Sequence, residues 1–221
     1  ILSFLFISVF YLTGVSAQRA GVAPTTVASK MSLVLTVLFS VFVFKEEPGP
    51  FGWLGIALAL VGVILSTWSA EGRARGSAWT LPVLLFFGNA AIDIGINITQ
   101  RTRTTPLTEA VFPTIVFGCA GLLGLLWSLK RKERMAYRDP RTWIAGLILG
   151  TVNYGSLYFV VKALANSGLP SSSVFPLMNI GVILFGSAAS MLLFRERLKP
   201  VHIAGIVVSV VAMALIMSAQ I

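Results

Sequence analysis

Two ionisable residues lie inside otherwise apolar stretches, where they could bind a charged solute. Lys30 stands about seven residues into the apolar stretch 23–44, and Asp93 is the one acidic residue deep within the stretch 78–100. Charges at membrane depth are costly and usually face a cavity or a partner. Lys30 would then meet an anionic group, while Asp93 would bind a cationic group or carry a proton. Two alternatives stay open: Lys30 reaches back to the interface, or Lys30 and Asp93 pair directly.

Three polar residues of the stretch 78–100 share one helix face. Asn89, Asp93 and Asn97 recur at positions i, i+4 and i+8. In lipid such a face must turn inward, because unpaired polar groups there cost several kcal/mol. The face therefore lines a cavity, or it forms a polar seam that holds two helices together.

Further polar residues lie in the second half. Asn153 and Tyr158 fall in the middle of an apolar stretch, and Tyr154 shares a face with Tyr158. Hydroxyl-bearing rings suit a pocket for a small amphipathic molecule, although interfacial anchoring or interhelical hydrogen bonding explains each residue equally well. Asn179, which follows Pro176, has the same character. The predicted substrate-binding or translocation residues are Lys30, Asn89, Asp93, Asn97, Asn153 and Tyr158.

The sequence lacks the common signatures of catalysis and nucleotide binding. There is no Walker A loop, HExxH or GxSxG. The single histidine, His202, has no cysteine or acidic cluster beside it and makes a poor metal site. We therefore expect no enzyme activity, no metal and no cofactor. The missing nucleotide site argues against an ATP-driven pump, unless a partner subunit supplies one.

Composition decides the class of protein. Of the 221 residues, 56% are hydrophobic and only 11% are charged, and the mean hydropathy is +0.88. Soluble domains carry about 25% charged residues. We therefore expect an all-α polytopic membrane protein whose main partner is the lipid bilayer. The net charge of +9 comes from basic residues between the apolar runs, which indicates membrane topology rather than nucleic-acid binding.

The apolar runs predict about eight spans. Residues 1–20 are interpreted as a membrane helix rather than a signal peptide, because no basic segment precedes them. A bilayer core of roughly 30 Å needs about 20 apolar residues per helix. The other predicted helices cover residues 23–44, 50–68, 78–100, 107–129, 142–165, 171–194 and 200–218.

The start of the chain recurs near its end. Two pairs have a spacing of 147 (168 − 21), and two later pairs have a spacing of 150 (200 − 50). The pairs are Gly21–Gly168, Met31–Met178, Pro50–Pro200 and Gly55–Gly205. Such duplications build many transporters. The simplest account is a five-plus-five plan that lacks its first two helices. Residues 1–70 would hold the last three helices of the first repeat, and residues 77–221 the whole second repeat.

The charged breaks between helices carry a family resemblance. Two charged breaks match each other: Phe44-Lys45-Glu46 and Phe194-Arg195-Glu196. Each precedes a helix that contains a glycine followed by an apolar stretch, and in the first copy Gly62-Val63 comes after that stretch. This order resembles the EamA family of the drug/metabolite transporter superfamily. We interpret both glutamates as orienting their turns.

The resemblance implies ten helices in two inverted repeats around a central cavity. It also implies movement of small metabolites, amino acids or drugs, often outward, across the inner membrane, with both termini cytoplasmic. The distribution of basic residues instead favours an external C-terminus. Of the 17 basic residues, 12 lie in the connections after the first, third, fifth and seventh predicted helices, and the side that is richer in basic residues is usually cytoplasmic.

Two functions follow from these observations. The first is a secondary transporter, an exporter of small organic solutes working by alternating access, with proton coupling as an open addition. The second is a non-transporting membrane subunit, or an inactive truncated relic of such a transporter. The oligomeric state is left open.

Overall fold

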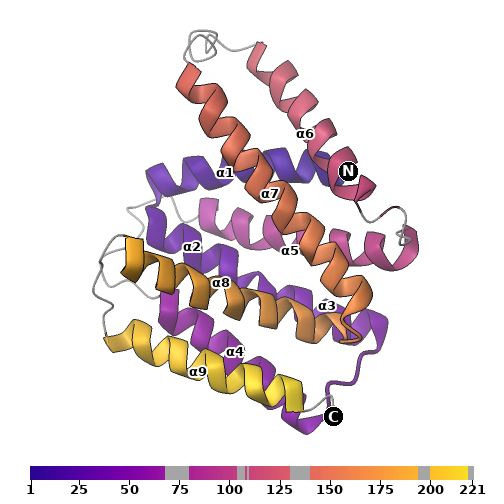
Figure 1. Ribbon diagram of the computed structural model, residues 1–221, viewed down its shortest axis with the longest axis vertical. Coiled ribbons are helices and arrows are strands. Elements are labelled where there is room, and N and C mark those ends of the chain that lie inside the picture. The colour runs from indigo at the N-terminus through magenta and orange to yellow at the C-terminus, as the bar shows by residue number, and fades with distance from the viewer. Residues whose placement is uncertain (68–79, 104–107, 109, 130–139, 194–199, 219–221) are drawn as a thin grey trace. The chain divides into compact units, whose positions relative to one another are not determined.

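The computed structural model describes residues 1–67, 80–103, 108, 110–129, 140–193 and 200–218. Within these ranges every regular element is a helix (Figure 1). The helices are α1 (Leu2–Arg19), α2 (Val22–Met31), α3 (Leu33–Phe44), α4 (Gly49–Thr67), α5 (Thr80–Arg103), α6 (Val111–Leu129), α7 (Pro140–Asn166), α8 (Ser171–Leu193) and α9 (Pro200–Ser218).

The helices match the predicted spans, except that one span is divided. Residues 23–44 form α2 and α3, which meet at Ser32. The Ser32 hydroxyl donates to the carbonyl of Ser29 at 2.7 Å, and the Thr36 hydroxyl lies 3.4 Å from the carbonyl of Ser32. Hydroxyls that bond back to their own helix bend it. Helix α6 begins at Val111 rather than at 107, and residues 104–107 and 109 lie outside the described part.

The helices have the lengths and compositions of membrane spans. Four described segments are long and apolar enough to cross a membrane: Leu2–Arg19, Thr25–Phe44, Thr80–Thr102 and Pro140–Asn166. Four shorter apolar helices accompany them: Gly49–Leu65, Val111–Leu126, Ser171–Phe185 and Ile203–Ser218. The protein is an all-α polytopic membrane protein, as the composition predicts.

The chain forms two compact units. Unit 1 comprises Ile1–Tyr11 and Gly95–Gly168, and unit 2 comprises Leu12–Ile94 and Leu169–Ile221. The division falls within α1 and within α5. The predicted repeat bounds, 1–70 and 77–221, stay a prediction.

Unit 2 is built on the pair α4 and α9, which lie side by side (Figure 1). Gly55 of α4 faces Ala212 and Ile216, whereas Gly62 faces Gly205 and Ser209. Residue numbers rise along α4 as they fall along α9, so the two helices are antiparallel. The glycines let the backbones approach closely, which is a common way of packing helices in lipid.

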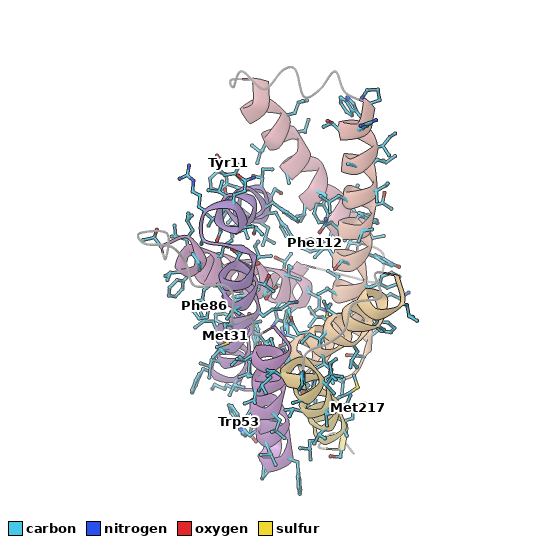
Figure 2. The ribbon with its side chains drawn as sticks, turned by 90° about the vertical axis from the view of Figure 1, so that its left-hand side faces the viewer. Tyr11, Met31, Trp53, Phe86, Phe112 and Met217 are labelled. Carbon is cyan, nitrogen blue, oxygen red and sulfur yellow. The ribbon has the colours of Figure 1, made fainter. Side chains whose placement is uncertain are left out.

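Other helices of unit 2 pack around this pair. Helix α8 contacts α3, α4 and α9. The apolar residues Val37, Val63 and Ile180 are almost fully buried. Figure 2 shows Trp53 and Met217 on the outside of the unit, and both side chains are exposed, as expected for residues that face lipid.

The end of α1 belongs to unit 2 through a buried hydrogen bond. The hydroxyls of Ser16 and Thr25 lie 2.7 Å apart, and both residues are buried. Two hydroxyls that satisfy each other are the arrangement that an apolar surrounding requires. This contact agrees with the interpretation of residues 1–20 as a membrane helix.

Unit 1 contains α6 and α7, which contact each other. The start of α1 packs on α6, with the rings of Phe6 and Phe117 centred 5.3 Å apart. The first half of α7 is exposed, including the large apolar side chains of Trp143, Leu147 and Ile148. In a bilayer this half of α7 can face lipid tails or another helix.

Candidate functional site

Lys30 lies inside unit 2, in the last turn of α2. Its ammonium group donates a hydrogen bond of 3.1 Å to Oδ1 of Asn179 on α8. The amide of Asn179 is itself oriented, because its Nδ2 donates to the carbonyl of Phe175 at 3.1 Å. The oxygen of that amide is thereby left to face Lys30. Lys30 thus bonds to another helix of unit 2, and whether it faces a cavity stays a prediction.

Ser32 joins α2 to α3 two residues after Lys30. Ser32 is nearly fully buried, and its backbone N–H bonds to the carbonyl of Ala28 at 3.2 Å. After the break, α3 buries Leu33, Thr36 and Val37, which lie on one helix face. Lys30 on α2 and the packed face of α3 both lie within unit 2.

Asp93 faces the same region from α5. Its Oδ2 lies 3.5 Å from the hydroxyl of Thr36, which can donate to it. Asp93 and Lys30 also interact electrostatically. The hydrogen bond of the lysine goes to Asn179, and a direct pair of Lys30 with Asp93 stays a prediction.

Asn89 stands one turn before Asp93 and also faces α2. Its Nδ2 donates to the hydroxyl of Ser29 at 3.3 Å and to the carbonyl of Leu85 at 2.8 Å. The predicted polar face of α5 is thus turned towards α2 and α3 at these two positions. We call the following residues of unit 2 the polar cluster: Ser29, Lys30, Thr36, Asn89, Asp93 and Asn179.

The polar cluster can bind both signs of charge. It holds one ammonium and one carboxylate among neutral amides and hydroxyls, so it is neutral overall. A solute with one kind of charge would pair with one of these two residues and leave the other, of the same sign as the solute, without compensation in a poorly solvated region, which is costly. A solute that carries both a carboxylate and an ammonium could satisfy Lys30 and Asp93 together.

The other three predicted site residues belong to unit 1. Asn97 is buried, and its Oδ1 accepts a hydrogen bond of 3.3 Å from Nε of Arg101. Asn153 donates to the carbonyl of Leu149, in its own helix, at 2.9 Å. These contacts stabilise α5 and α7 locally. A binding role for either residue stays a prediction.

Tyr158 forms part of an aromatic stack on α7. Its ring is parallel to that of Tyr154, with centroids 6.5 Å apart, and the ammonium of Lys162 lies 5.8 Å from the centroid of Tyr158. Tyr154 donates to the carbonyl of Ala110 at 3.1 Å, which ties α7 to the start of α6. The interhelical hydrogen bonding considered from the sequence is therefore observed for Tyr154, and the role of Tyr158 stays a prediction.

Three members of the polar cluster were not among the predicted site residues. Asn179 had a visible signal, since it is an amide three residues after a proline within an apolar run. Ser29 and Thr36 are small hydroxyl residues that occur in many helices, and only their contacts with α5 distinguish them. Within the described residues, no three His, Cys, Asp or Glu side chains come together as metal ligands would.

Known proteins resemble this chain over most of its length. An uncharacterized protein of Haemophilus influenzae is 26% identical over 216 residues, which cover 96% of this chain and 72% of that protein. One protein of known crystal structure matches with a TM-score of 0.75 at 16% identity, over 96% of this chain and 74% of that one. At such low identity, this likeness shows the fold alone.

The match to a protein family is more specific. The sequence model of the EamA-like transporter family matches residues 1–68 and 80–218. These segments contain every helix described above and all members of the polar cluster. The chain therefore belongs to the EamA-like transporter family, within the drug/metabolite transporter superfamily.

Proposed function

We propose that the protein is a secondary transporter that exports small organic solutes across the inner membrane by alternating access. Family membership supports transport as the general activity. The observation that carries the site is the meeting of Lys30 and Asp93 with the amides of Asn89 and Asn179 in one unit. Such a group of polar side chains within apolar helices is the usual mark of a solute or ion pathway.

The cluster favours zwitterionic solutes of the amino-acid type. Lys30 would receive the carboxylate, with Asn179 keeping the ammonium of the lysine in place. Asp93 would receive the positive group of the solute. Solute binding would replace the interaction between the two protein charges, so neither charge would be left uncompensated.

The test is counterflow in proteoliposomes with a radiolabelled mixture of the L-amino acids. We expect uptake by the wild type and its loss in Lys30→Ala and in Asp93→Asn, with normal insertion of both variants. Two exposed charges supply matched controls. Lys45→Asn removes a positive charge and suits the left-handed backbone at that position. Glu47→Gln removes a negative charge.

Each outcome of this test has a meaning. Full flux in Lys30→Ala and Asp93→Asn would remove the assignment of the site. Binding of the labelled amino acids without flux in the wild type would favour the non-transporting alternative. Proton coupling is tested separately by imposing a pH gradient, and flux that ignores the gradient would contradict it.

A further inference from the structure

The turn between α3 and α4 reaches the beginning of α8. Helix α3 ends at Phe44, and Lys45 adopts a left-handed conformation with φ of 53°. Gly49, where α4 begins, also has a positive φ, of 67°. This sharp reversal places Glu46 against Ser171 and Ser172, the first two residues of α8. A residue of the charged break thus contacts a helix that begins 125 residues later.

Glu46 uses both carboxylate oxygens in this contact. Its Oε1 accepts from the hydroxyl of Ser171 at 2.6 Å and from the backbone N–H of Ser171 at 3.1 Å. Its Oε2 accepts from the backbone N–H of Ser172 at 2.8 Å. The first N–H groups of a helix have no partner within the helix, and its N-terminus favours a negative charge. The carboxylate supplies both requirements.

The contact keeps Glu46 ionised. Burial by itself would raise the pKa of Glu46, but the hydrogen bonds from Ser171 and Ser172 outweigh burial and hold the pKa below its ordinary value. The carboxylate is therefore charged at neutral pH, and its hydrogen bonds are of the stronger, charge-assisted kind. A second contact joins the same helix ends, because the hydroxyls of Ser40 on α3 and Ser171 lie 3.2 Å apart.

The two helices joined in this way also carry the polar cluster. Thr36 lies one turn before Ser40 on α3, and Asn179 lies two turns after Ser171 on α8. Eight residues of α-helix span about 12 Å. The contact of Glu46 therefore stands beside the cluster, at the end where α3 finishes and α8 begins.

We propose that Glu46 is a positioning residue for transport. It holds the end of α3 to the start of α8 and thereby closes the polar cluster at the end where these helices meet. This contact breaks when the cluster opens at that end. This inference rests on the proposed transport function. In the predicted duplication Glu46 belongs to the first repeat and Ser171 to the second, so the contact joins the parts that would rock against each other. A cap from within α8 would satisfy the same N–H groups without joining two helices.

The first experiment needs no solute. In a Cys119→Ser background, which removes the single cysteine, Ser40→Cys and Ser171→Cys are combined and oxidised in membranes. Their hydroxyls are 3.2 Å apart, so the two thiols should be close enough to form a disulfide. Ser171→Cys removes the hydroxyl bond to Glu46 but keeps the two bonds from the backbone N–H groups of residues 171 and 172. We therefore expect Glu46→Ala in this background to slow disulfide formation more than about tenfold, the change that loss of even one charge-assisted hydrogen bond produces.

Glu47→Ala is the matched control, because it removes an exposed carboxylate from the same turn. It should leave the rate of disulfide formation unchanged. Glu46→Gln keeps the side-chain volume and one acceptor oxygen, so its rate of disulfide formation should lie between the rates of Glu46→Ala and Glu47→Ala. This variant also tests the proposal if Glu46→Ala fails to fold. Equal rates in the wild type and in both Glu46 variants would overturn the proposal.

The second experiment separates a moving contact from a static one. The oxidised Ser40→Cys/Ser171→Cys protein should still bind the labelled L-amino acids but lose counterflow, and a reductant should restore it. Equal counterflow before and after reduction would overturn the opening step. If the reduced protein neither binds nor transports these solutes, the proposed function fails, while the disulfide rates still decide whether Glu46 joins α3 to α8.

Discussion

The close contact between α4 and α9 allows a prediction of both sign and size. A Cβ atom on Gly62 would lie 2.9 Å from the backbone nitrogen of Ser209 and 3.1 Å from the carbonyl oxygen of Gly205, and it would overlap the hydroxyl of Ser209. Two of these three atoms belong to backbone, which cannot rotate away. The substitution Gly62→Ala should therefore push the two helices apart.

The size follows from two opposing effects. Overpacking of a tight contact costs about 1–3 kcal/mol, and the upper part of that range applies where backbone is met. Alanine gains about 1 kcal/mol over glycine within a helix. The expected net loss for Gly62→Ala is about 2 kcal/mol. For a chain of this length, about 2–4 °C per kcal/mol gives a fall in Tm of about 4–8 °C.

Gly118→Ala is the matched control. A Cβ atom on Gly118 of α6 would meet nothing within 4 Å. Only the gain in helix propensity applies there, so Tm should stay equal or rise by about 2–4 °C. The measurement is thermal unfolding in detergent, followed by the helical circular dichroism signal. A Gly62→Ala protein that melts at or above the temperature of Gly118→Ala would refute the close approach of α4 and α9.

Three further predictions concern the polar contacts. Asn179→Leu removes the acceptor for Lys30 at similar volume, so solute binding measured by equilibrium dialysis should weaken about tenfold or more while membrane insertion is unchanged. Thr36→Val removes only a long contact of 3.5 Å with Asp93, so Kd in the same assay should change less than about threefold. The pKa of Glu46 lies below its ordinary value of 4.5, so its contribution to stability is complete above that pH and is lost as the pH falls through the lowered pKa. Tm measured against pH should therefore show wild type above Glu46→Gln at pH 7 and a narrowing difference in acid; a difference that stays constant down to pH 3 would contradict the ionised contact.

The spans could be predicted from the sequence because hydrophobicity decides them. Apolar runs of about 20 residues become helices in lipid, where the backbone must satisfy its own hydrogen bonds. The break at Ser32 was not predicted. At this position the hydroxyls of Ser32 and Thr36 bond back to the carbonyls of Ser29 and Ser32, and serine and threonine make such bonds in some helices and not in others.

The candidate site could be predicted only in part. Asn89 and Asp93 are four residues apart, and local periodicity is enough to place them on one face. The contact between Lys30 and Asn179 joins residues 149 positions apart, which no local pattern reveals. The interpretation of Glu46 as orienting its turn stays a prediction, and its partners in α8 depend on tertiary packing. The matching break with Glu196 lies outside the described residues.

The packing of α4 on α9 bears on how the chain is duplicated. The sequence pairs Gly55 with Gly205 and Gly62 with position 212, both at a spacing of 150. In unit 2, Gly55 meets Ala212 and Gly62 meets Gly205. If each residue is exchanged for its match in the other copy, the contact between Gly55 and Ala212 becomes the contact between Gly205 and Gly62. Such an exchange is the mark of a two-fold relation. Because the two helices are antiparallel, such a relation would be an inversion across the bilayer, as the predicted inverted repeats require.

The charges of the polar cluster do not follow this two-fold relation. At the spacing of 147, Lys30 corresponds to Leu177, and Ser32 corresponds to Asn179. Symmetric packing alone would favour similar residues in both copies, and it does not explain a lysine in only one of them. A solute that carries unlike groups at its two ends does need unlike partners. In the proposed transporter, the symmetric helix pair would provide a frame in which either side can open, and the asymmetric pair of Lys30 and Asn179 would give the bound solute one orientation.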